Sequence, residues 1–510
     1  MPKKCVSECS KRAEAECAGP RCQFVRGKTK RYCKLNNAYA FGPGCEVRRR
    51  TFKRKIAERS ITNPEVERRI NPAVRIQRFF QTKTNWLQRR CPNPNDCFLV
   101  GSHVPELTKY FEGFTNFNLV QHVRKIAQGM NGFINELTYT KHGFTAYALL
   151  KSSFGGDNLA YEYLVGKFFV NSVSNYFPCF VETYGLFYYP SEEAIASVLN
   201  EGGRLSTREL RELQPQRHVV NVPKACISSK SACVLIQHVQ TSMNLYTLVY
   251  EKTRNQTFLN DNLLHSLFSV YHALSCLSDR FTHYDFHTGN LLLAWMDNAK
   301  YFEYHYHFED HPDVVFRSPY VPKIIDYGRC YVKVSPAVRR KMVESPECSV
   351  CYDEVGAPRS TQDCWDDKGF FFYDKADTYR QFGLDAGVKN ESHDLRLLNE
   401  LVRRQGQPFH RTSKAMRTAS ESLKAMQRIC AQVVYGVGTN HSEKEYGTRE
   451  NVTLSETHIY NVTGAFRALR AAVSLDAVVQ QNMQTYNDPA LKIGEFHVYG
   501  TDRQMTFSRV

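Results

Sequence analysis

The sequence lacks long apolar segments. No stretch approaches the roughly 18 consecutive apolar residues of a transmembrane helix, so we expect none. The N-terminus, Met-Pro-Lys-Lys-Cys-Val-Ser-Glu-Cys, carries charges where a signal peptide has its apolar core, so we expect no signal peptide either. In a chain without these features, the 17 cysteines are expected to be mostly thiols or metal ligands.

Acidic residues are scarce in the first part of the chain. Residues 1–100 contain 24 Lys and Arg but only 8 Asp and Glu, which accounts for the whole formal net charge of +16. The sequence therefore predicts a neutral body with a basic head. Residues 1–90 would bind nucleic acid or an anionic surface by releasing counterions, or they form a solvated basic linker.

The head is also poor in aliphatic residues, so it cannot build a hydrophobic core alone. Metal or disulfides should stabilise it. Three states are open for its cysteines: zinc bound by four of them, disulfides, or free thiols. The residues concerned are Cys5, Cys9, Cys17, Cys22, Cys33 and Cys45.

Two motifs in the middle of the chain carry the chemistry. The stretch at 281–293 reads Phe-Thr-His-Tyr-Asp-Phe-His-Thr-Gly-Asn-Leu-Leu-Leu, which contains His283, Asp285 and Asn290. Asp326 follows in Lys-Ile-Ile-Asp-Tyr-Gly. Phosphoryl transfer to a hydroxyl needs one carboxylate to receive the proton, and a second carboxylate with an amide to hold Mg²⁺ against the nucleotide phosphates. We therefore expect Asp285 in the first role and Asn290 and Asp326 in the second.

The segments upstream supply the other parts of such a site. Gly129-Met-Asn-Gly132 lies between two predicted strands, where backbone N–H groups can approach phosphates because glycine has no Cβ. Lys151 ends the strand Ala-Tyr-Ala-Leu-Leu-Lys, and Glu162 lies in the following helix as its expected partner. An apolar strand at 233–239 should lead to a hinge whose adenine-facing carbonyl comes from about His238–Gln240.

This set of motifs resembles the protein-kinase superfamily, which has H-R-D-x-x-x-x-N and D-F-G at the corresponding places. Tyr284 stands where Arg is usual, His287 where Lys is frequent, and Tyr327 where Phe is usual. The His-x-Asp-x-His-x-Gly-Asn form is also similar to small-molecule kinases of the aminoglycoside phosphotransferase type. The resemblance implies ATP and Mg²⁺ as cofactors. It also implies that Lys151 contacts the α and β phosphates and that Gly129, Gly132 and His238 line the nucleotide site.

The resemblance implies an α+β, bilobal protein-kinase-like fold, with an antiparallel β-sheet N-lobe, a mainly α C-lobe and a small Cys-rich N-terminal segment. We divide the chain accordingly into a Cys-rich basic head at 1–60, a basic linker or helix at 61–97, an N-lobe at 98–240, and a C-lobe with insertions at 241–510. Asp394 resembles the buried aspartate that holds the catalytic loop of kinases from below.

The chain also resembles kinase-like proteins of large nucleocytoplasmic DNA viruses, through its Cys-rich basic head, Ile-Gln-Arg-Phe-Phe and Phe-Pro-Cys-Phe-Val-Glu-Thr-Tyr-Gly. This resemblance implies a viral serine/threonine protein kinase, acting on a protein phosphoacceptor in the host cytoplasm or the virion. A catalytically weak or inactive kinase-like scaffold, associated with virions or nucleic acid, is the alternative.

A histidine-rich segment at 295–320 separates the two motifs. It contains His305, His307 and His311. We expect an exposed insertion here, because the kinase mechanism needs nothing at this place, and a metal site is the other interpretation.

Overall fold

The structure, a computed structural model, describes residues 86–128, 132–153, 159–215, 232–250, 255–297, 299–335, 389–403, 419–434 and 455–510, together with four short strands elsewhere. The chain divides into two compact units, Met1–Thr82 and Lys83–Val510. The first unit contributes an antiparallel pair, β1 (Cys22–Arg26) and β2 (Arg31–Leu35). The metal or disulfides expected in the head concern side chains outside the described residues.

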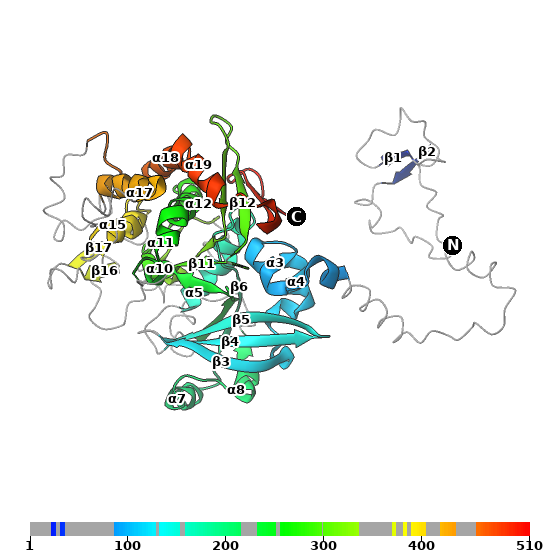
Figure 1. Cartoon of the computed structure of the whole chain (residues 1–510). Helices are drawn as coiled ribbons and strands as arrows, with labels where there is room; N and C mark the ends of the chain where they lie inside the picture. Colours follow the sequence, from blue (N-terminus) through cyan, green and yellow to red (C-terminus); the bar gives the residue numbers. More distant parts are fainter. Residues whose placement is uncertain are drawn as a thin grey trace. The chain divides into compact units, whose positions relative to one another are not determined.

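The second unit begins with helices that cover one face of a six-stranded sheet (Figure 1). All neighbouring strands are antiparallel, in the order β3-β4-β5-β8-β6-β7. The strands are β3 (Val120–Gln128), β4 (Gly132–Lys141), β5 (Phe144–Ser153), β6 (Thr183–Tyr188), β7 (Gln214–Pro215) and β8 (Ala232–Gln237). The helices of this lobe are α3 (Pro94–Val100), α4 (Val104–Tyr110), η4 (Glu112–Phe114), η5 (Phe117–Leu119), α7 (Glu192–Asn200) and α8 (Thr207–Glu212).

The folded body begins before residue 98, which corrects the boundary that we expected between linker and N-lobe. Leu87 and Cys91 are fully buried, at 0 % exposure, in the core between the sheet and α3 and α4. Cys91 is also joined to Cys97 by a disulfide. The last part of the expected linker therefore belongs to the N-lobe, because its apolar side chains fill that lobe's core.

One long helical segment connects β5 to β6. It consists of α5 (Leu159–Val165), the π-helical turn η6 (Gly166–Val170) and α6 (Asn171–Val173). The segment packs closely on β6 because Gly166 has no side chain; a Cβ there would lie 2.0 Å from Oγ1 of Thr183. Asn171 fixes the contact by donating to the carbonyl of Thr183 at 2.8 Å and accepting from its N–H at 2.9 Å. This packing sets where Glu162 lies.

After β8, the described residues of the second unit combine helices with small sheets, and several of these helices pack around the buried helix α12. Every residue of α12 from Leu263 to Leu274 is buried, and α17 and α18 pack against it. The helices are α10 (Leu245–Tyr250), α11 (Asn255–Thr257), the π-helical η8 (Phe258–Asn262), α12 (Leu263–Cys276), α15 (Arg396–Arg403), α17 (Glu421–Gln432), α18 (Val462–Val473) and α19 (Asp476–Thr485). Short 3₁₀ turns are η9 (Thr288–Asn290), η10 (Tyr327–Arg329), η12 (His393–Leu395) and η14 (Pro489–Leu491).

Small sheets at the junction of the two lobes carry the motif residues. β11 pairs with β14 and β9, so that Leu291 lies opposite Ile324. Because Asn290 precedes β11 and Asp326 follows β14, this register brings the two residues to the same end of the pair. The strands are β9 (Ser242–Asn244), β10 (Phe281–Thr282), β11 (Leu291–Ala294), β14 (Val321–Ile324) and β15 (Tyr331–Val332), with a further pair at β16 (Phe370–Tyr373) and β17 (Gln381–Leu384).

The histidine-rich segment is not an exposed insertion, contrary to our expectation. It forms β12 (Tyr301–Tyr306) and β13 (Val314–Ser318), which join β18 (Lys492–Val498) and β19 (Thr506–Arg509) in one four-stranded sheet. Tyr304 and Tyr306 are fully buried on its inner face. The alternation of aromatic and histidine residues thus makes one face of the sheet part of the C-lobe core.

The described part of the chain is of mixed α+β class, with an antiparallel sheet in one lobe and helices in the other, compatible with a bilobal kinase-like fold. Among the described residues, no helix combines the length and the apolar character needed to cross a membrane.

Candidate active site

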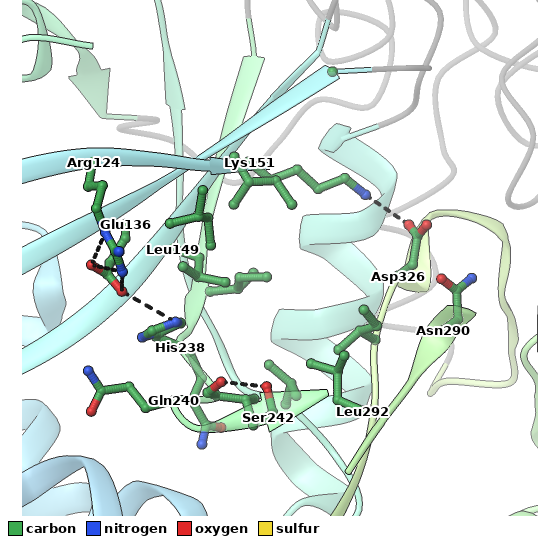
Figure 2. A pocket seen from close by; sticks show the side chains of 18 of the residues that line it. Arg124, Glu136, Leu149, Lys151, His238, Gln240, Ser242, Asn290, Leu292 and Asp326 are labelled. Carbon is green, nitrogen blue, oxygen red and sulfur yellow. Dashed lines mark hydrogen bonds and ion pairs between the residues drawn. The ribbon is translucent and has the colours of Figure 1, made fainter. Parts of the chain in front are cut away.

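A cavity of about 950 Å³ lies between the two lobes (Figure 2). Ile134 and Leu149 line it from the N-lobe sheet, and Leu292 and Ile325 line it from β11 and the end of β14. Residues 237–241, which run from the last residue of β8 into the segment that joins the lobes, also line it. An apolar slot bordered by the backbone of a hinge suits a flat aromatic base, with polar groups at its ends for orientation.

Lys151 lies at one end of the cavity, between two carboxylates. Its Nζ donates to Oε2 of Glu162 at 2.7 Å and to Oδ1 of Asp326 at 2.8 Å. Glu162 is only 2 % exposed, so its charge is buried and held by the ion pair. The expected Lys151–Glu162 pair is therefore present. The helix α5, which carries Glu162, packs against β8, the strand that lies next to β5 in the sheet.

Asp326 has an unusual backbone conformation. Its φ of 70° and ψ of 71° are left-handed, as is the φ of 62° at Tyr284 in the other motif. Such conformations cost of order 1–3 kcal/mol in a non-glycine residue and persist only where the surroundings enforce them. Tyr327 supplies part of that enforcement, since its hydroxyl donates to the carbonyl of Ile324 at 2.6 Å and accepts from the N–H of Val181 at 3.0 Å.

Asp394 holds the loop that carries Asp285, as the resemblance implied. Its carboxylate accepts from the backbone N–H groups of His283 at 2.8 Å and Tyr284 at 3.0 Å. Burial raises the pKa of Asp394 to about 7, while these two hydrogen bonds act in the opposite direction. Asp394 comes from η12, far along the sequence, so it ties the loop to the helical lobe.

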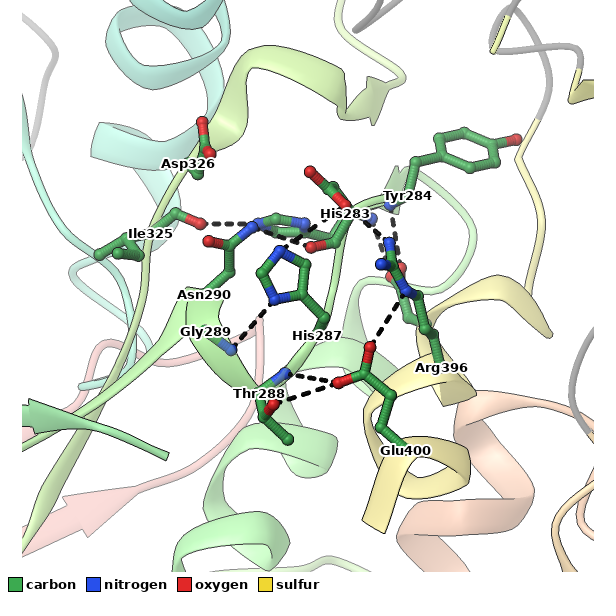
Figure 3. A network of polar contacts seen from close by, with 12 residues as sticks. His283, Tyr284, His287, Thr288, Gly289, Asn290, Ile325, Asp326, Arg396 and Glu400 are labelled. Carbon is green, nitrogen blue, oxygen red and sulfur yellow. Dashed lines mark hydrogen bonds and ion pairs between the residues drawn. The ribbon is translucent and has the colours of Figure 1, made fainter. Parts of the chain in front are cut away.

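His283 connects the two motifs. Burial lowers its pKa to about 4, although the nearby Asp285 carboxylate opposes this, so the imidazole is neutral at pH 7. A neutral ring must donate from Nε2 to reach the carbonyl of Ile325, which lies at 3.0 Å (Figure 3). Since Ile325 directly precedes Asp326, this bond fixes the position of Asp326 relative to the loop.

Asp285 contacts a cation that the sequence patterns did not reveal. Nη1 of Arg396, at the start of α15, lies 2.7 Å from its Oδ1. Nε of Arg396 lies 3.5 Å from Glu400, whose Oε2 accepts from both the N–H and the hydroxyl of Thr288 at 3.1 Å (Figure 3). The loop is thus held at Asp285 and at Thr288 by two residues of one helix.

His287 lies beside the same carboxylate. Its Nε2 is 3.8 Å from Oδ1 of Asp285, and its Nδ1 accepts from the N–H of Gly289 at 3.0 Å. Burial lowers the pKa of His287, and the Asp285 carboxylate opposes this shift. Acceptance at Nδ1 places the ring proton on Nε2, so a neutral His287 presents a donor toward Asp285.

Asn290 and Asp326 fit a magnesium ion. Both line the cavity next to Lys151, and the amide nitrogen of Asn290 donates to the carbonyl of Asp285 at 3.0 Å, which leaves the amide oxygen as a possible ligand. Amide and carboxylate oxygens are the ligands that this hard cation prefers, together with water and phosphate oxygens. The register of β11 and β14 explains why two residues from separate motifs meet here.

Comparison with known proteins adds little to this geometry. No protein-family model matches the chain, and no curated protein matches it in sequence. Among solved structures, it is similar to one titled "WaaP in complex with acyl carrier protein", at 10 % sequence identity and a TM-score of 0.22. That match covers 46 % of this chain and 75 % of the other, and at such a TM-score it carries no argument about function.

The hinge end of the cavity has charges that sequence reasoning missed. Arg124 donates to both carboxylate oxygens of Glu136, each at 3.1 Å, and Nε2 of His238 lies 3.6 Å from the same carboxylate (Figure 2). Burial lowers the pKa of His238, although Glu136 opposes the shift. His238 does line the cavity, as expected for the hinge. The alternation of β3 and β4 was the available signal, because Arg124 and Glu136 face each other across that pair.

The glycine turn is described only in part. Gly132 lines the cavity at the start of β4, whereas Gly129 lies outside the described residues. The structure thus brings together six of the expected site residues around one cavity, while Asp285 lies just beyond it, bonded to Asn290. The six are Gly132, Lys151, Glu162, His238, Asn290 and Asp326.

Proposed function

We propose that this protein is an ATP-dependent phosphotransferase with an alcohol as acceptor, and specifically a serine/threonine protein kinase. One observation carries the proposal: Lys151 is paired with Glu162 and Asp326 at the end of an interlobe cavity that also holds Asn290. A structural protein needs no buried ion pair facing an open slot of this size. The viral resemblance, with its location in host cytoplasm or virion, stays a prediction.

The residues define a mechanism in which most of the catalysis is positioning and charge stabilisation. The base of ATP would lie between Leu149 and Leu292, against the hinge backbone at 237–239. Lys151 would then neutralise phosphate oxygens, with Glu162 holding its ammonium group in place. Asn290 and Asp326 would hold Mg²⁺, which when bound offsets the charge on the phosphates.

Asp285 completes the reaction at the acceptor. The hydroxyl of the acceptor would donate a hydrogen bond to the Asp285 carboxylate, which orients the oxygen toward the terminal phosphorus. As the new P–O bond forms, the bond between that phosphorus and the bridging oxygen of ADP would break, ADP would leave, and the carboxylate would receive the hydroxyl proton. Arg396 holds Oδ1 of Asp285 at 2.7 Å, so the carboxylate keeps one orientation before the acceptor arrives.

Nucleotide binding and phosphate transfer test the proposal together. We expect ATP to bind more tightly with Mg²⁺ than without it, and radiolabelled phosphate to appear on serine or threonine of a general protein substrate or of the protein itself. Mg²⁺-dependent binding without any transfer would instead support the inactive scaffold. Absence of nucleotide binding would contradict both the site and its cofactors.

Arg396 should act through Asp285. Arg396→Ala is expected to lower kcat by on the order of 10–10²-fold, since a misplaced catalytic group loses productive geometry, with little change in the affinity for ATP. Arg396→Lys should recover part of the lost kcat, because lysine keeps the positive charge but lacks the planar guanidinium group with its several fixed N–H donors. Arg467→Ala, an exposed arginine on α18, is the matched control and should behave like the parent. Equal losses in ATP affinity and kcat would mean that Arg396 serves folding only.

The basic head should bind nucleic acid without sequence preference. Residues 1–82 hold 21 Lys and Arg against 7 Asp and Glu, so their removal leaves a body near neutrality. We expect the full chain to bind DNA or RNA with an affinity that falls steeply with salt, and the chain without residues 1–82 to lose this binding. Unchanged affinity and salt dependence after the deletion would show that the head is a solvated segment.

The state of the six head cysteines decides how that head is built. Of the three states, bound zinc makes the structure of the head depend on metal, disulfides make it depend on oxidation, and free thiols make it depend on neither. A chelator should unfold the head in the first case and a reductant in the second, as followed by circular dichroism of the full chain.

A further inference from the structure

We propose that the outer face of the β12–β18 sheet is a divalent transition-metal site of the zinc class, with His305, Glu495 and His497 as ligands. Each residue offers one donor atom, and the three donor atoms lie within 4.8 Å of one another. The site is separate from the cavity between the lobes.

The fold brings these residues together through an unusual strand pairing. β12 and β18 are parallel neighbours, and His305 lies directly opposite His497, as Glu303 lies opposite Glu495. The alternate residues of both strands, such as Tyr304 and Phe496, are fully buried. A core on one face thus forces the histidines onto the other, on a rigid scaffold that needs no metal to form.

A chain of hydrogen bonds sets His497 in the state that binds metals. Oδ2 of Asp313 lies 2.7 Å from Nδ1 of His307, and Nε2 of His307 lies 3.1 Å from Nδ1 of His497. If His307 is neutral, the carboxylate requires its proton on Nδ1, so its Nε2 accepts and Nδ1 of His497 donates. Nε2 of His497 is then left with a lone pair. Carboxylate–histidine links of this kind orient and tune metal-binding imidazoles.

The lone pair of His497 faces another acceptor. Its Nε2 lies 3.6 Å from Oε2 of Glu495, while Oε1 of Glu495 accepts from Lys492 at 2.6 Å. Two acceptors at this distance attract a cation between them. Zinc with bonds of ~2.0 Å in tetrahedral geometry places its ligand atoms roughly 3.3 Å apart, so this pair already has nearly the required spacing.

His305 supplies the third ligand and completes a two-histidine, one-carboxylate set. Its ring lies beside that of His497, with centroids 4.7 Å apart and planes within 17° of parallel, and its Nε2 lies 3.2 Å from Glu303. Because an imidazole lone pair lies in the plane of the ring, the His305 ring would turn out of this stacked arrangement to bind the ion held by His497. Imidazole nitrogen suits zinc and its neighbours in the first transition row, and not Mg²⁺, which takes oxygen ligands. Three protein ligands leave a fourth position for water. The ion would fasten β18 to β12 of the β12–β13 hairpin.

Zinc titration of the full chain tests the site, with no nucleotide present, so that the result does not depend on the kinase proposal. Relative to the parent, His305→Ala and His497→Ala should each bind about one equivalent of Zn²⁺ less, because the head cysteines contribute equally to all variants. His311→Ala, an exposed histidine of the same hairpin, should match the parent. Excess Mg²⁺ should not displace the ion.

Two milder variants keep the test valid if an alanine variant misfolds. Glu495→Gln nearly preserves shape and should weaken zinc binding more than Asp313→Asn, which acts through His307 and should cost about tenfold in affinity. Zinc should also raise the Tm of the parent but not that of His497→Ala. If parent, His305→Ala, His497→Ala and Glu495→Gln take up equal zinc, the proposal is wrong, and a protonated His497 paired with Glu495 explains the geometry.

Discussion

Replacement of Asp285 by asparagine should lower the rate of phosphoryl transfer by about 10²-fold or more, which is the usual contribution of a positioned proton acceptor. The amide keeps the size of the side chain but cannot take the proton of the acceptor hydroxyl. ATP affinity should change little, because Asp285 does not line the cavity and its backbone carbonyl, which binds Asn290, is unchanged. Steady-state phosphate transfer and ATP titration, each with Mg²⁺, measure the two effects.

Asp310→Asn is the matched control for this experiment, since it makes the same chemical change at an exposed position of the β12–β13 hairpin. It should keep the parent's rate. Transfer at the parent's rate by Asp285→Asn would remove Asp285 from the mechanism. If the parent binds ATP but transfers no phosphate, the inactive scaffold is favoured, whatever the result for Asp285→Asn.

Asp326→Asn should abolish the dependence of ATP binding on Mg²⁺ and, with it, transfer. The carboxylate is the charged member of the oxygen pair formed with Asn290, and a neutral amide holds a hard cation much less strongly. The substitution also removes the charge that lies 2.8 Å from Nζ of Lys151. Calorimetric titration with ATP, with and without Mg²⁺, separates the two forms of binding.

The outcome of this second experiment discriminates between activity and scaffold. We expect the parent to bind Mg²⁺-ATP more tightly than ATP alone and the variant to bind both forms alike. If Mg²⁺ does not change the affinity for ATP in either the parent or Asp326→Asn, then Asn290 and Asp326 hold no metal. The exposed Asp310→Asn again controls for the change of charge.

Sequence reasoning predicted which candidate site residues lie together where these residues are close along the chain or lie near the ends of strands. Asp285 and Asn290 belong to one short loop, so their spacing alone places them together. Lys151 lies near the end of β5, and Glu162 lies in the first turn of the next helix, α5. Asp326 follows an apolar strand that pairs with the strand after Asn290. In each case local pattern and the kinase resemblance agree.

The misses are contacts between distant segments. Nothing in the sequence near Arg396 marks it as the partner of Asp285, because α15 reaches the loop only after the helices of the C-lobe have packed. The exposed insertion that we expected at 295–320 was wrong for a related reason. The alternation of Tyr304, His305 and Tyr306 indicates a strand. The strand that pairs with it, β18, comes nearly two hundred residues later in the sequence, so the pairing could not be predicted.

By itself, then, the sequence determined the chemistry that this protein has available: two carboxylates, an amide and a lysine in the order of a phosphotransferase, a basic cysteine-rich head, and histidines on alternate positions of a strand. Tertiary structure decided which of these groups meet. The Lys151–Asp326 ion pair spans 175 residues and the His307–His497 contact spans 190. Such contacts depend on strand register and on helix packing throughout the core. Local periodicity in the sequence indicates which face of a strand or helix is buried, but it does not specify which buried faces pack against each other.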